Sequence, residues 1–166
     1  MERIMIIGCG GAGKSTLARQ LGEKTGLPVV HLDKLFWKPG WVSLSQEEFD
    51  ERHRAAIARQ SWIMDGNFDR TIPERLERCD TVLYLDFSRF ACLLGVAKRI
   101  ITSYGQVRPD MGDGCPERFD WEFLQWVWNF NRNKQEKNYR LLAQCADKEI
   151  HIFKNRRQVR KFLESL

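Results

Sequence analysis

The segment Gly8–Thr16, with the sequence GCGGAGKST, constrains the fold of this chain more than any other. It fits the phosphate-binding pattern G-x-x-x-x-G-K-[ST], known as Walker A, at every position. The apolar run Ile4–Ile7 before it is typical of a buried strand, and Leu17–Leu21 after it favours a helix. A strand, a glycine loop and a helix in this order are the context in which the pattern binds phosphate. The alternative is a glycine-rich turn that merely opens a helix.

The glycines suit this loop to an anion. Glycine adopts positive φ and lets the backbone approach a phosphate closely, so that successive N–H groups form a concave nest. The helix that follows adds the partial positive charge of its N-terminus. We expect Lys14 to reach the β- and γ-phosphates of ATP as a catalytic residue, and the Ser15 hydroxyl to hold Mg²⁺. The residues expected to bind ATP are Gly8, Gly10, Gly11, Ala12, Gly13, Lys14, Ser15 and Thr16.

Composition limits the class of protein. The 166 residues are enough for one domain, and 43% hydrophobic and 30% charged residues are ordinary for a globular chain. No apolar run approaches the length of a membrane span, and the N-terminus lacks a secretory pattern. We therefore expect a single cytoplasmic domain over residues 1–166. The five cysteines are widely spaced and form no C-x-x-C, so reduced thiols are expected rather than disulfides or a zinc site.

The net charge of +5 has two interpretations. An enzyme that handles phosphates needs cations near its substrates, whereas a nucleic-acid-binding protein needs a basic face. Apolar residues at helical spacing run through the densest basic cluster, so we interpret it as the solvated side of a last helix. The cluster comprises Lys154, Arg156, Arg157, Arg160 and Lys161.

Alternating apolar segments and helical patterns predict the fold class. The expected strands are Arg3–Gly8, Pro28–Leu32, Ser61–Asp65, Thr81–Asp86 and Glu149–Phe153. The expected helices are Lys14–Thr25, Ser45–Gln60, Ile72–Glu77, Arg89–Tyr104, Asp120–Cys145 and Gln158–Leu166. Ser45 with Glu48 fits a capping box, and Asp120 is placed as an N-cap. Strands that alternate with helices favour a three-layer α/β/α P-loop NTPase fold with a five-stranded parallel sheet.

Two segments in the C-terminal half stand out. Residues 105–119, GQVRPDMGDGCPERF, hold three glycines and two prolines and are expected to form a loop that acts as a lid. The next helix is apolar nearly all round in its first turns, from Trp121 to Phe130. We expect these turns to be buried on most sides. The alternative is a platform on which nucleobases stack.

The segment Ser61–Arg78, SWIMDGNFDRTIPERLER, resembles the part of adenylate kinases that runs from a strand into Asp-Gly-Phe-Pro-Arg-Thr. Here one extra residue precedes the arginine, and the proline before it is missing. In adenylate kinases the aspartate orders Mg²⁺ through water, and the arginine holds the phosphate of the acceptor nucleotide. The resemblance implies a water-mediated metal role for Asp65 and a substrate-binding role for Arg70. The alternative for Asp65 is a turn residue.

Over nearly its whole length the chain resembles the topology modulation proteins, small bacterial P-loop proteins related to adenylate and shikimate kinases. The matching features are the phosphate loop, His31-Leu32-Asp33 followed by Trp37 and Trp41, Asp65-Gly66-Asn67-Phe68, and the 105–119 loop that leads into the Trp-rich helix. The name of that family points to DNA supercoiling. Its fold implies a nucleoside monophosphate kinase-like enzyme with a lid insertion that acts on a small molecule.

Asp33 ends the second expected strand, at the edge of a parallel sheet where ligands lie. A carboxylate there can accept the proton of an attacking hydroxyl or hold that hydroxyl in line. Shikimate kinases bind the acceptor hydroxyls with an acid after the second strand, so the resemblance implies a catalytic and substrate-binding role for Asp33. The alternative is an N-cap for a short helix at Lys34–Trp37. Asp33 favours a hydroxyl acceptor, whereas Arg70 favours a nucleoside monophosphate.

Arginines around the lid complete the expected site, because phosphoryl transfer needs positive charge on the moving oxygens. By resemblance to adenylate kinases, we expect catalytic roles for Arg99 before the loop, Arg108 within it and Arg132 on the following helix. Arg156, after the last strand, is expected near the adenine by the same resemblance. For each of them the alternative is a solvated surface arginine.

These features predict an ATP- and Mg²⁺-dependent kinase that phosphorylates a nucleotide, a nucleoside or another hydroxylated metabolite. An alternative is a nucleic-acid-associated ATPase or regulatory switch that affects DNA topology. A third is a phosphate-binding protein without catalysis, which the presence of Lys14, Ser15 and Asp65 disfavours. No membrane partner is expected, and the sequence leaves the acceptor and the oligomeric state open.

Overall fold

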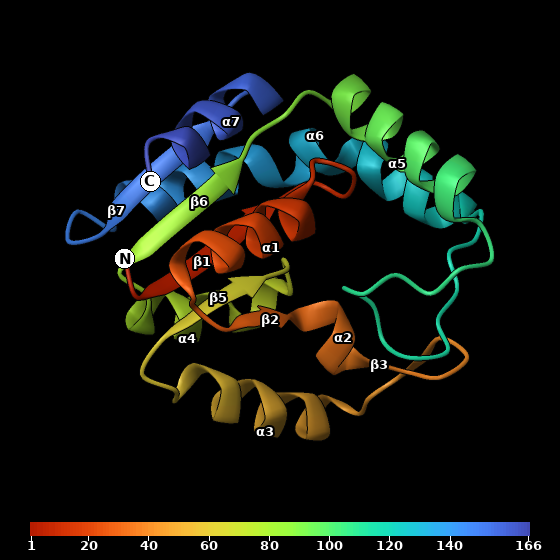
Figure 1. Cartoon of the computed structure of the whole chain (residues 1–166), viewed down its shortest axis with the longest axis horizontal. Coiled ribbons are helices and arrows are strands. Elements are labelled where there is room, and N and C mark those ends of the chain that lie inside the picture. Colours follow the sequence, from red (N-terminus) through yellow and green to blue (C-terminus); the bar gives the residue numbers. More distant parts are fainter.

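The computed structural model describes residues 1–166 and has a five-stranded parallel sheet at its centre. The strands lie in the order β2-β5-β1-β6-β7 (Figure 1). Their bounds are Arg3–Gly8 for β1, Val29–His31 for β2, Trp62–Asp65 for β5, Thr81–Leu85 for β6 and Glu149–Phe153 for β7. All four neighbouring pairs are parallel. The predicted sheet is confirmed, with small shifts at strand ends.

The central strands are continuous apolar runs because helices cover both faces of the sheet. Residues 4–7 of β1 are at most 1% exposed. In the sheet, β2 and β5 lie on one side of β1, and β6 and β7, which come later in the chain, lie on the other side. In open α/β sheets, ligands bind beyond the carboxyl ends of the strands where the winding reverses. The phosphate loop, which follows β1, lies at this point.

Two apolar clusters form the outer layers of the core. On one face of the sheet, α1 (Lys14–Thr25), α5 (Arg89–Ser103) and α7 (Arg156–Glu164) contribute buried side chains. On the other face, α3 (Gln46–Ile57) and α4 (Ile72–Arg78) do so. The long helix α6 (Trp121–Ala143) reaches from one cluster to the other, with Val127 in the first and Leu142 in the second. The three-layer prediction is confirmed.

Side-chain caps set the ends of several helices. The predicted capping box of α3 is formed between Ser45 and Glu48, and Asp120 caps α6 as expected. The last helix begins at Arg156, two residues earlier than predicted, because Asn155 accepts a hydrogen bond from the backbone N–H of Gln158. Arg156 thus belongs to the first turn of α7 rather than to a loop.

Three short elements add to the predicted helices and strands, and the first lies close to the short helix at Lys34–Trp37 that was named as an alternative. The helix α2 (Leu32–Phe36) begins directly after β2 and contains Asp33, so Asp33 is not the N-cap of a later helix. A hairpin of β3 (Trp37–Lys38) and β4 (Val42–Ser43) follows it. A 3-10 turn, η1 (Asp69–Thr71), precedes α4. Elements of this length carry too few residues for a periodic pattern to show.

Residues 105–119 form the predicted loop, which packs on the β3–β4 hairpin (Figure 1). The amide of Gly40 donates to the carbonyl of Gly114, and the Trp41 indole N–H donates to the carbonyl of Pro116 at 3.2 Å. The Cys115 thiol lies 3.2 Å from the carbonyl oxygen of Lys38. Two segments more than 60 residues apart in sequence therefore form one surface beside the sheet.

The tryptophan-rich start of α6 differs from the prediction. Trp121, Trp126 and Trp128 are among the exposed large hydrophobic residues, whereas burial on most sides was expected. Only one side of these turns packs inward, through Val127 and Phe130. The reason is that α5 and the phosphate loop pack on one side of these turns, so part of the apolar circumference faces outward.

All five cysteines are free thiols in the structure. No helix of the structure has the length and apolar character that a membrane crossing requires.

Candidate active site

The phosphate loop presents backbone donors that the protein itself does not use. The N–H groups of residues 13–16 donate to no backbone or side-chain acceptor. No side chain caps α1, whose N-cap is Gly13. Unsatisfied amides at a helix N-terminus form an anion site, because the amides and the helix dipole point the same way. This loop therefore fits a polyphosphate.

Two glycines make this shape possible. Gly11 has φ +78°, and a Cβ placed on it would lie 2.2 Å from the carbonyl oxygen of Cys92 in α5. Gly13 has φ +98°, and a Cβ placed on it would meet no atom within 4 Å, so this residue opens onto free space. The first glycine lets the loop pack tightly against α5. The second leaves the mouth of the amide nest unobstructed.

Lys14 and Asn67 hold the two ends of the loop. The Lys14 ammonium donates to the carbonyl of Cys9 at 3.0 Å, which bends the lysine back over the loop. The side-chain amide of Asn67 donates to the carbonyl of Gly8 at 2.9 Å, and its Oδ1 accepts from the Gly8 N–H at 3.1 Å. Asn67 thereby extends the contact between β5 and β1 to Gly8, the last residue of β1, which is a positioning role not assigned from the sequence.

Arg75 fixes the segment that carries Asn67. This arginine is fully buried in α4 and donates to the carbonyl of Gly66 at 2.8 Å and to the carbonyl of Asn67. Burial lowers the pKa of its guanidinium to about 10. It remains charged at neutral pH and satisfies carbonyls that have no helix or strand partner. The sequence of α4 is rich in charged residues, and nothing in it indicated that Arg75 would be buried.

Asp65 lies at the carboxyl end of β5 beside the phosphate loop, and it is 5% exposed. Its Oδ2 accepts a hydrogen bond from His31 Nδ1 at 2.9 Å. His31 therefore orients Asp65 and leaves the other carboxylate oxygen free. His31 was left out of the sequence-predicted site, because a lone histidine shows no partner until the strands pair.

The donor set suits Mg²⁺ bound together with a nucleotide. No group of three or more His, Cys, Asp or Glu side chains could hold a metal by itself. Mg²⁺ in nucleotide sites usually takes one or two protein oxygens and completes its shell with phosphates and water. Ser15 and Asp65 both line the same cleft and offer such oxygens.

Asp33 lines the same cleft as the phosphate loop. Burial raises the pKa of Asp33 to about 6, and the nearby charge of Asp65 adds to the increase. The positive charges of Lys14 and Arg108 act in the opposite direction. At neutral pH the carboxylate is mostly ionised yet is a stronger base than an ordinary aspartate. The position and the basicity suit a group that accepts a hydroxyl proton.

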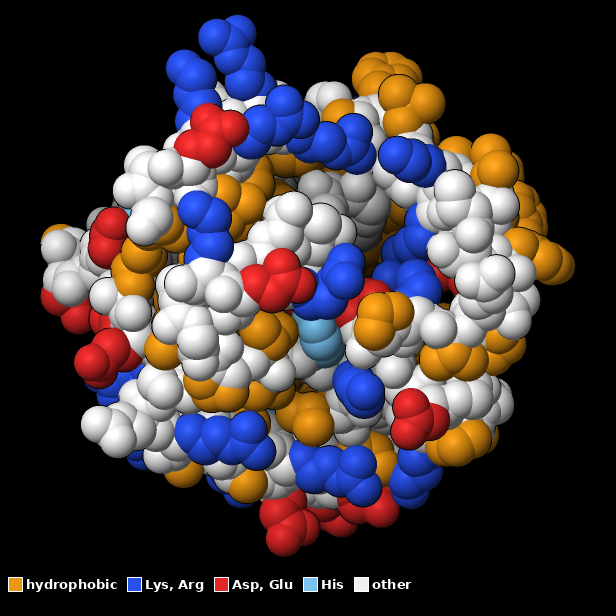
Figure 2. All heavy atoms as spheres, in the orientation of Figure 1, with side chains coloured by type: hydrophobic (Ala, Val, Ile, Leu, Met, Phe, Trp, Pro, Cys, Tyr) orange, Lys and Arg blue, Asp and Glu red, His pale blue; other side chains and the backbone are white.

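The loop, Asp33 and Asp65 open into a cleft of about 970 Å³. Seven basic and three acidic side chains line it. Figure 2 looks onto this face, where basic side chains gather round a hollow in the surface. The basic residues are Lys14, Arg19, Lys98, Arg99, Arg108, Arg156 and Arg160. Such an excess of positive charge attracts polyanionic ligands.

Two of the expected catalytic arginines, one before the loop and one within it, are brought together by one buried acid. Glu117 is 4% exposed and pairs with Arg99 Nε at 3.0 Å and with Arg108 Nε at 2.9 Å. Arg108 also pairs with Asp110 at 2.7 Å. Burial lowers the pKa of Arg99, and the neighbouring charge of Arg108 lowers it further. Glu117 was not assigned from the sequence, although it joins the two arginines that were.

The remaining predicted residues divide between the cleft and the outer surface. Arg156 lines the cleft, next to Gly95 of α5. Arg70 does not line it; its guanidinium forms a two-bond pair with Asp50 of α3 at 2.5 and 2.6 Å and lines a separate, smaller pocket. Arg132 is exposed on α6 and also lies outside the cleft. The structure thus brings Arg99, Arg108 and Arg156 together, but not Arg70 or Arg132.

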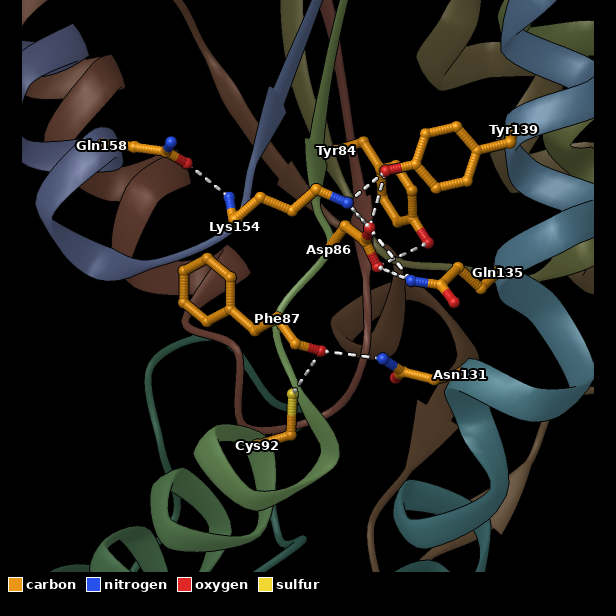
Figure 3. Close-up of polar contacts among 9 residues, drawn as sticks. All are labelled: Tyr84, Asp86, Phe87, Cys92, Asn131, Gln135, Tyr139, Lys154 and Gln158. Carbon is orange, nitrogen blue, oxygen red and sulfur yellow. Dashed lines mark hydrogen bonds and ion pairs between the residues drawn. The ribbon is translucent and has the colours of Figure 1, made fainter.

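A polar network at the end of β6 ties the last strand to α6 (Figure 3). The buried Asp86 carboxylate accepts hydrogen bonds from Gln135 at 2.8 Å, Tyr139 at 2.7 Å and Lys154. Burial acts to raise the pKa of Asp86, but these three donors hold it below its usual value. Lys154 pairs with Asp86, whereas Arg156 and Arg160 line the cleft, so the basic cluster is divided rather than presented as one face.

Comparisons with known proteins place this arrangement in a structural class. Residues 4–84, which run from β1 into β6, match a protein-family model described as an AAA domain. No curated protein sequence matches the chain significantly.

Two solved enzymes share the fold at low sequence identity. Shikimate kinase from Acinetobacter baumannii in complex with shikimate matches with a TM-score of 0.60 and 18% identity, over 99% of this chain and 90% of that one. Deoxyadenosine kinase from M. mycoides matches with TM-scores of 0.57 with bound dATP and 0.54 with the product dCMP and a flexible dCDP. These two matches have 16% and 17% identity and cover 98% of this chain and 95% of the other. The chain therefore has the fold of P-loop small-molecule kinases.

Proposed function

We propose that this protein is an ATP-dependent phosphotransferase that acts on a small hydroxylated acceptor. The observation that carries the proposal is the row of unpaired amides at the start of α1, which opens onto a cleft rich in basic side chains. The first amides of any helix lack partners within the helix, but here glycines with positive φ shape the preceding loop so that these amides line a basic cleft. The fold of P-loop small-molecule kinases supports the same conclusion.

The residues of the cleft have separable roles in this proposal. The amides of residues 13–16 bind the phosphate tail, and Lys14 leaves the Cys9 carbonyl to contact the β- and γ-phosphates. Asp33 holds the acceptor hydroxyl in line and takes its proton as the new phosphate bond forms. Arg99 and Arg108 place positive charge near the transferred group. Arg156 contacts the nucleotide from the α7 side.

Mg²⁺ would be held by the Ser15 hydroxyl and, through water, by Asp65. When bound, the ion neutralises charge on the phosphate oxygens. His31 acts on this site only by orienting Asp65. Residues 105–119 form the lid of a single domain in this proposal, with Arg108 carried on it.

The geometry favours a hydroxyl acceptor over a nucleoside monophosphate. Asp33 lies in the cleft, whereas Arg70, the expected anchor for an acceptor phosphate, is paired with Asp50 outside it. Among the proteins that share the fold, one is a shikimate kinase in complex with shikimate and another a deoxyadenosine kinase. Both names describe phosphorylation of a hydroxyl. The closer likeness to topology modulation proteins and a cytoplasmic location remain part of the proposal.

The alternative of a nucleic-acid-associated ATPase receives less support. It depended on the basic cluster near the C-terminus and on the aromatic start of α6. The tryptophans of α6 are exposed, but the cluster is divided between the Asp86 network and the cleft. DNA binding that weakens steeply with salt would restore this alternative.

A screen of hydroxylated acceptors tests the proposal. ADP release from ATP and Mg²⁺ is followed with nucleosides, sugars and hydroxy acids, using the wild-type protein, Lys14→Met and Lys24→Met. We expect at least one acceptor to stimulate ADP release by the wild-type protein and by Lys24→Met, in which an exposed lysine of the same helix is changed. Lys14→Met should lose the stimulation. Stimulation by no acceptor, or equal stimulation of Lys14→Met, would refute the proposal.

A further inference from the structure

The outer face of α5 carries an apolar stripe that the fold leaves uncovered. Along this helix the exposed residues Phe90, Leu94, Ala97, Ile101 and the C-cap Tyr104 are spaced four, three, four and three apart. This is the spacing of a seam between two packed helices. The opposite side of α5 already has partners, since Cys92 and Val96 are buried in the core. Most of the stripe therefore packs on nothing within one copy of the chain.

The neighbouring helix extends the same surface. At the start of α5, the Phe90 ring lies 5.7 Å from the Trp128 ring, measured between ring centroids. Near the end of α5, Arg99 lies over the ring of Phe123, which comes earlier in α6. The two helices therefore run antiparallel. Trp121 and Trp128, seven residues apart, face outward on α6. Figure 2 shows hydrophobic side chains gathered along the margin of the molecule where Figure 1 places α5.

The size of this surface exceeds what a monomer ordinarily exposes. Its six large side chains are between 43% and 82% exposed: Phe90, Leu94, Ile101, Tyr104, Trp121 and Trp128. At roughly 150–250 Å² for a large side chain, they present on the order of 700–800 Å². The largest apolar patch of a typical monomer is about 300–600 Å², whereas each partner of a standard interface buries about 800 Å².

The pattern of side-chain sizes identifies the occupant. Read from either end, the stripe runs aromatic, aliphatic, small, aliphatic, aromatic, and its centre is Ala97. If a second α5 packs antiparallel on the first, Phe90 meets Tyr104 and Leu94 meets Ile101, while the two Ala97 residues meet at the centre. A two-fold axis requires this kind of self-complementary surface. The small central residue lets the two helices approach closely.

We propose that a second copy of this chain covers the stripe, and that the two copies form a dimer about a two-fold axis through Ala97. The antiparallel helix dipoles favour this packing, and α6 of each copy widens the contact. Two charged side chains lie close to the stripe: Lys98, which lines the phosphate-binding cleft, and Arg89, which lies over the Trp128 ring, 4.9 Å from its centroid. The proposal does not depend on phosphotransferase activity.

Dimerisation would also act on the phosphate loop. The inner side of α5 lies directly against that loop, since a Cβ on Gly95 would lie 2.1 Å from the carbonyl oxygen of Gly11. The same helix carries Arg99 into the cleft. A partner that holds α5 in place therefore supports two parts of the candidate active site at once.

Sedimentation equilibrium tests the surface. We expect the wild-type protein to be dimeric at micromolar concentration and Leu94→Glu or Ile101→Glu to raise the dimer dissociation constant at least ~100-fold. Val42→Glu, which changes an exposed apolar residue on β4, should leave it unchanged. Wild-type protein that is still monomeric at about 100 µM, or glutamate variants that dimerise as well as wild type, would overturn the proposal.

Disulfide crosslinking tests the axis and does not depend on the glutamate variants. Under a mild oxidant, Ala97→Cys should form a covalent dimer. Leu94→Cys should not, because two residues 94 would lie about 10 Å apart along antiparallel helices, too far for a disulfide. Mixed Leu94→Cys and Ile101→Cys proteins should crosslink to each other. The wild-type protein controls for native thiols. Crosslinking of Leu94→Cys alone as fast as Ala97→Cys would refute the antiparallel arrangement.

Discussion

Replacing Asp33 by asparagine should stabilise the folded protein at neutral and alkaline pH while removing activity. In the folded state the pKa of Asp33 is about 6, against an ordinary value of 3.8, mainly because burial disfavours the charge. This difference of about two pKa units corresponds to ~3 kcal/mol, an upper limit because part of the side chain meets solvent. Asparagine has nearly the same shape and carries no charge, so it avoids this unfavourable contribution.

The pH dependence follows from the direction of the shift. A carboxyl group whose pKa is raised on folding favours the folded state when it is protonated. That contribution is fully present below pH 3.8 and is lost as the pH rises through about 6. The stabilisation by Asp33→Asn should therefore be small near pH 4 and reach ~2–3 kcal/mol at pH 8.

Urea unfolding followed by tryptophan fluorescence measures this effect. The free energy of unfolding is determined for wild type, Asp33→Asn and Asp113→Asn at pH 4.5, 6 and 8. Asp113 is an exposed acid of the 105–119 loop and should show no such dependence. A stabilisation by Asp33→Asn that is equal at all three pH values, or a destabilisation at pH 8, would contradict the idea that a buried charge is retained here for function.

Three further substitutions test contacts around the site. Asn67→Ala removes both hydrogen bonds to Gly8, so the free energy of unfolding should fall by about 1–3 kcal/mol and ATP affinity should weaken, as measured by urea unfolding and titration. Glu117→Gln removes the charge that two arginines share, and a loss of about 2–4 kcal/mol in urea unfolding is expected. Lys154→Met leaves the Asp86 carboxylate without its cation. It should destabilise the fold by about 2 kcal/mol at pH 7 in thermal unfolding, less than a fully buried pair because more than half of the lysine is exposed. Because the pKa of Asp86 is lowered on folding, the stability it contributes is lost as the pH falls below 3.8, and the difference between the two proteins should narrow there.

Exposed residues of α6 provide matched controls for these variants. Asn133→Ala, Glu122→Gln and Lys137→Met change the same residue types on the outer side of the helix. Each should alter the free energy of unfolding by less than about 0.5 kcal/mol. If the control variants lower the free energy of unfolding as much as the site variants do, the contacts around the site contribute no more than those of an exposed helix surface.

Much of the fold could be predicted from the sequence, because the central strands repeat one simple pattern. A strand buried on both faces, such as β1, is a short apolar run, and each such run is followed by a helix with one apolar side. The caps Ser45 and Asp120 act locally, within three residues, so their effect could be predicted too. The β3–β4 hairpin could not, since its strands have two residues each and depend on the 105–119 loop for support.

The parts of the candidate site that lie within one short segment could be predicted from the sequence. The parts that join residues from separate elements could be predicted only incompletely. The phosphate loop is one continuous segment, so its shape can be predicted from its own residues. His31 with Asp65, and Glu117 with two arginines, join residues from separate elements and exist only after the sheet and loop have packed. Arg132 was placed by analogy with other kinases, and here the helix turns it to solvent. The exposed stripe of α5 has the same apolar composition as a buried helix, so its position outside the core needed the structure.

Binding of a non-hydrolysable ATP analogue is the most direct test of the central claim, that free amides and Lys14 at the start of α1 hold a polyphosphate. Calorimetric titration with Mg²⁺ compares wild type, Lys14→Met and Lys24→Met. We predict that Lys14→Met weakens binding by ~2–3 kcal/mol, roughly 30–150-fold, while Lys24→Met matches wild type. Wild-type affinity in Lys14→Met, or no binding by the wild-type protein, would contradict the account.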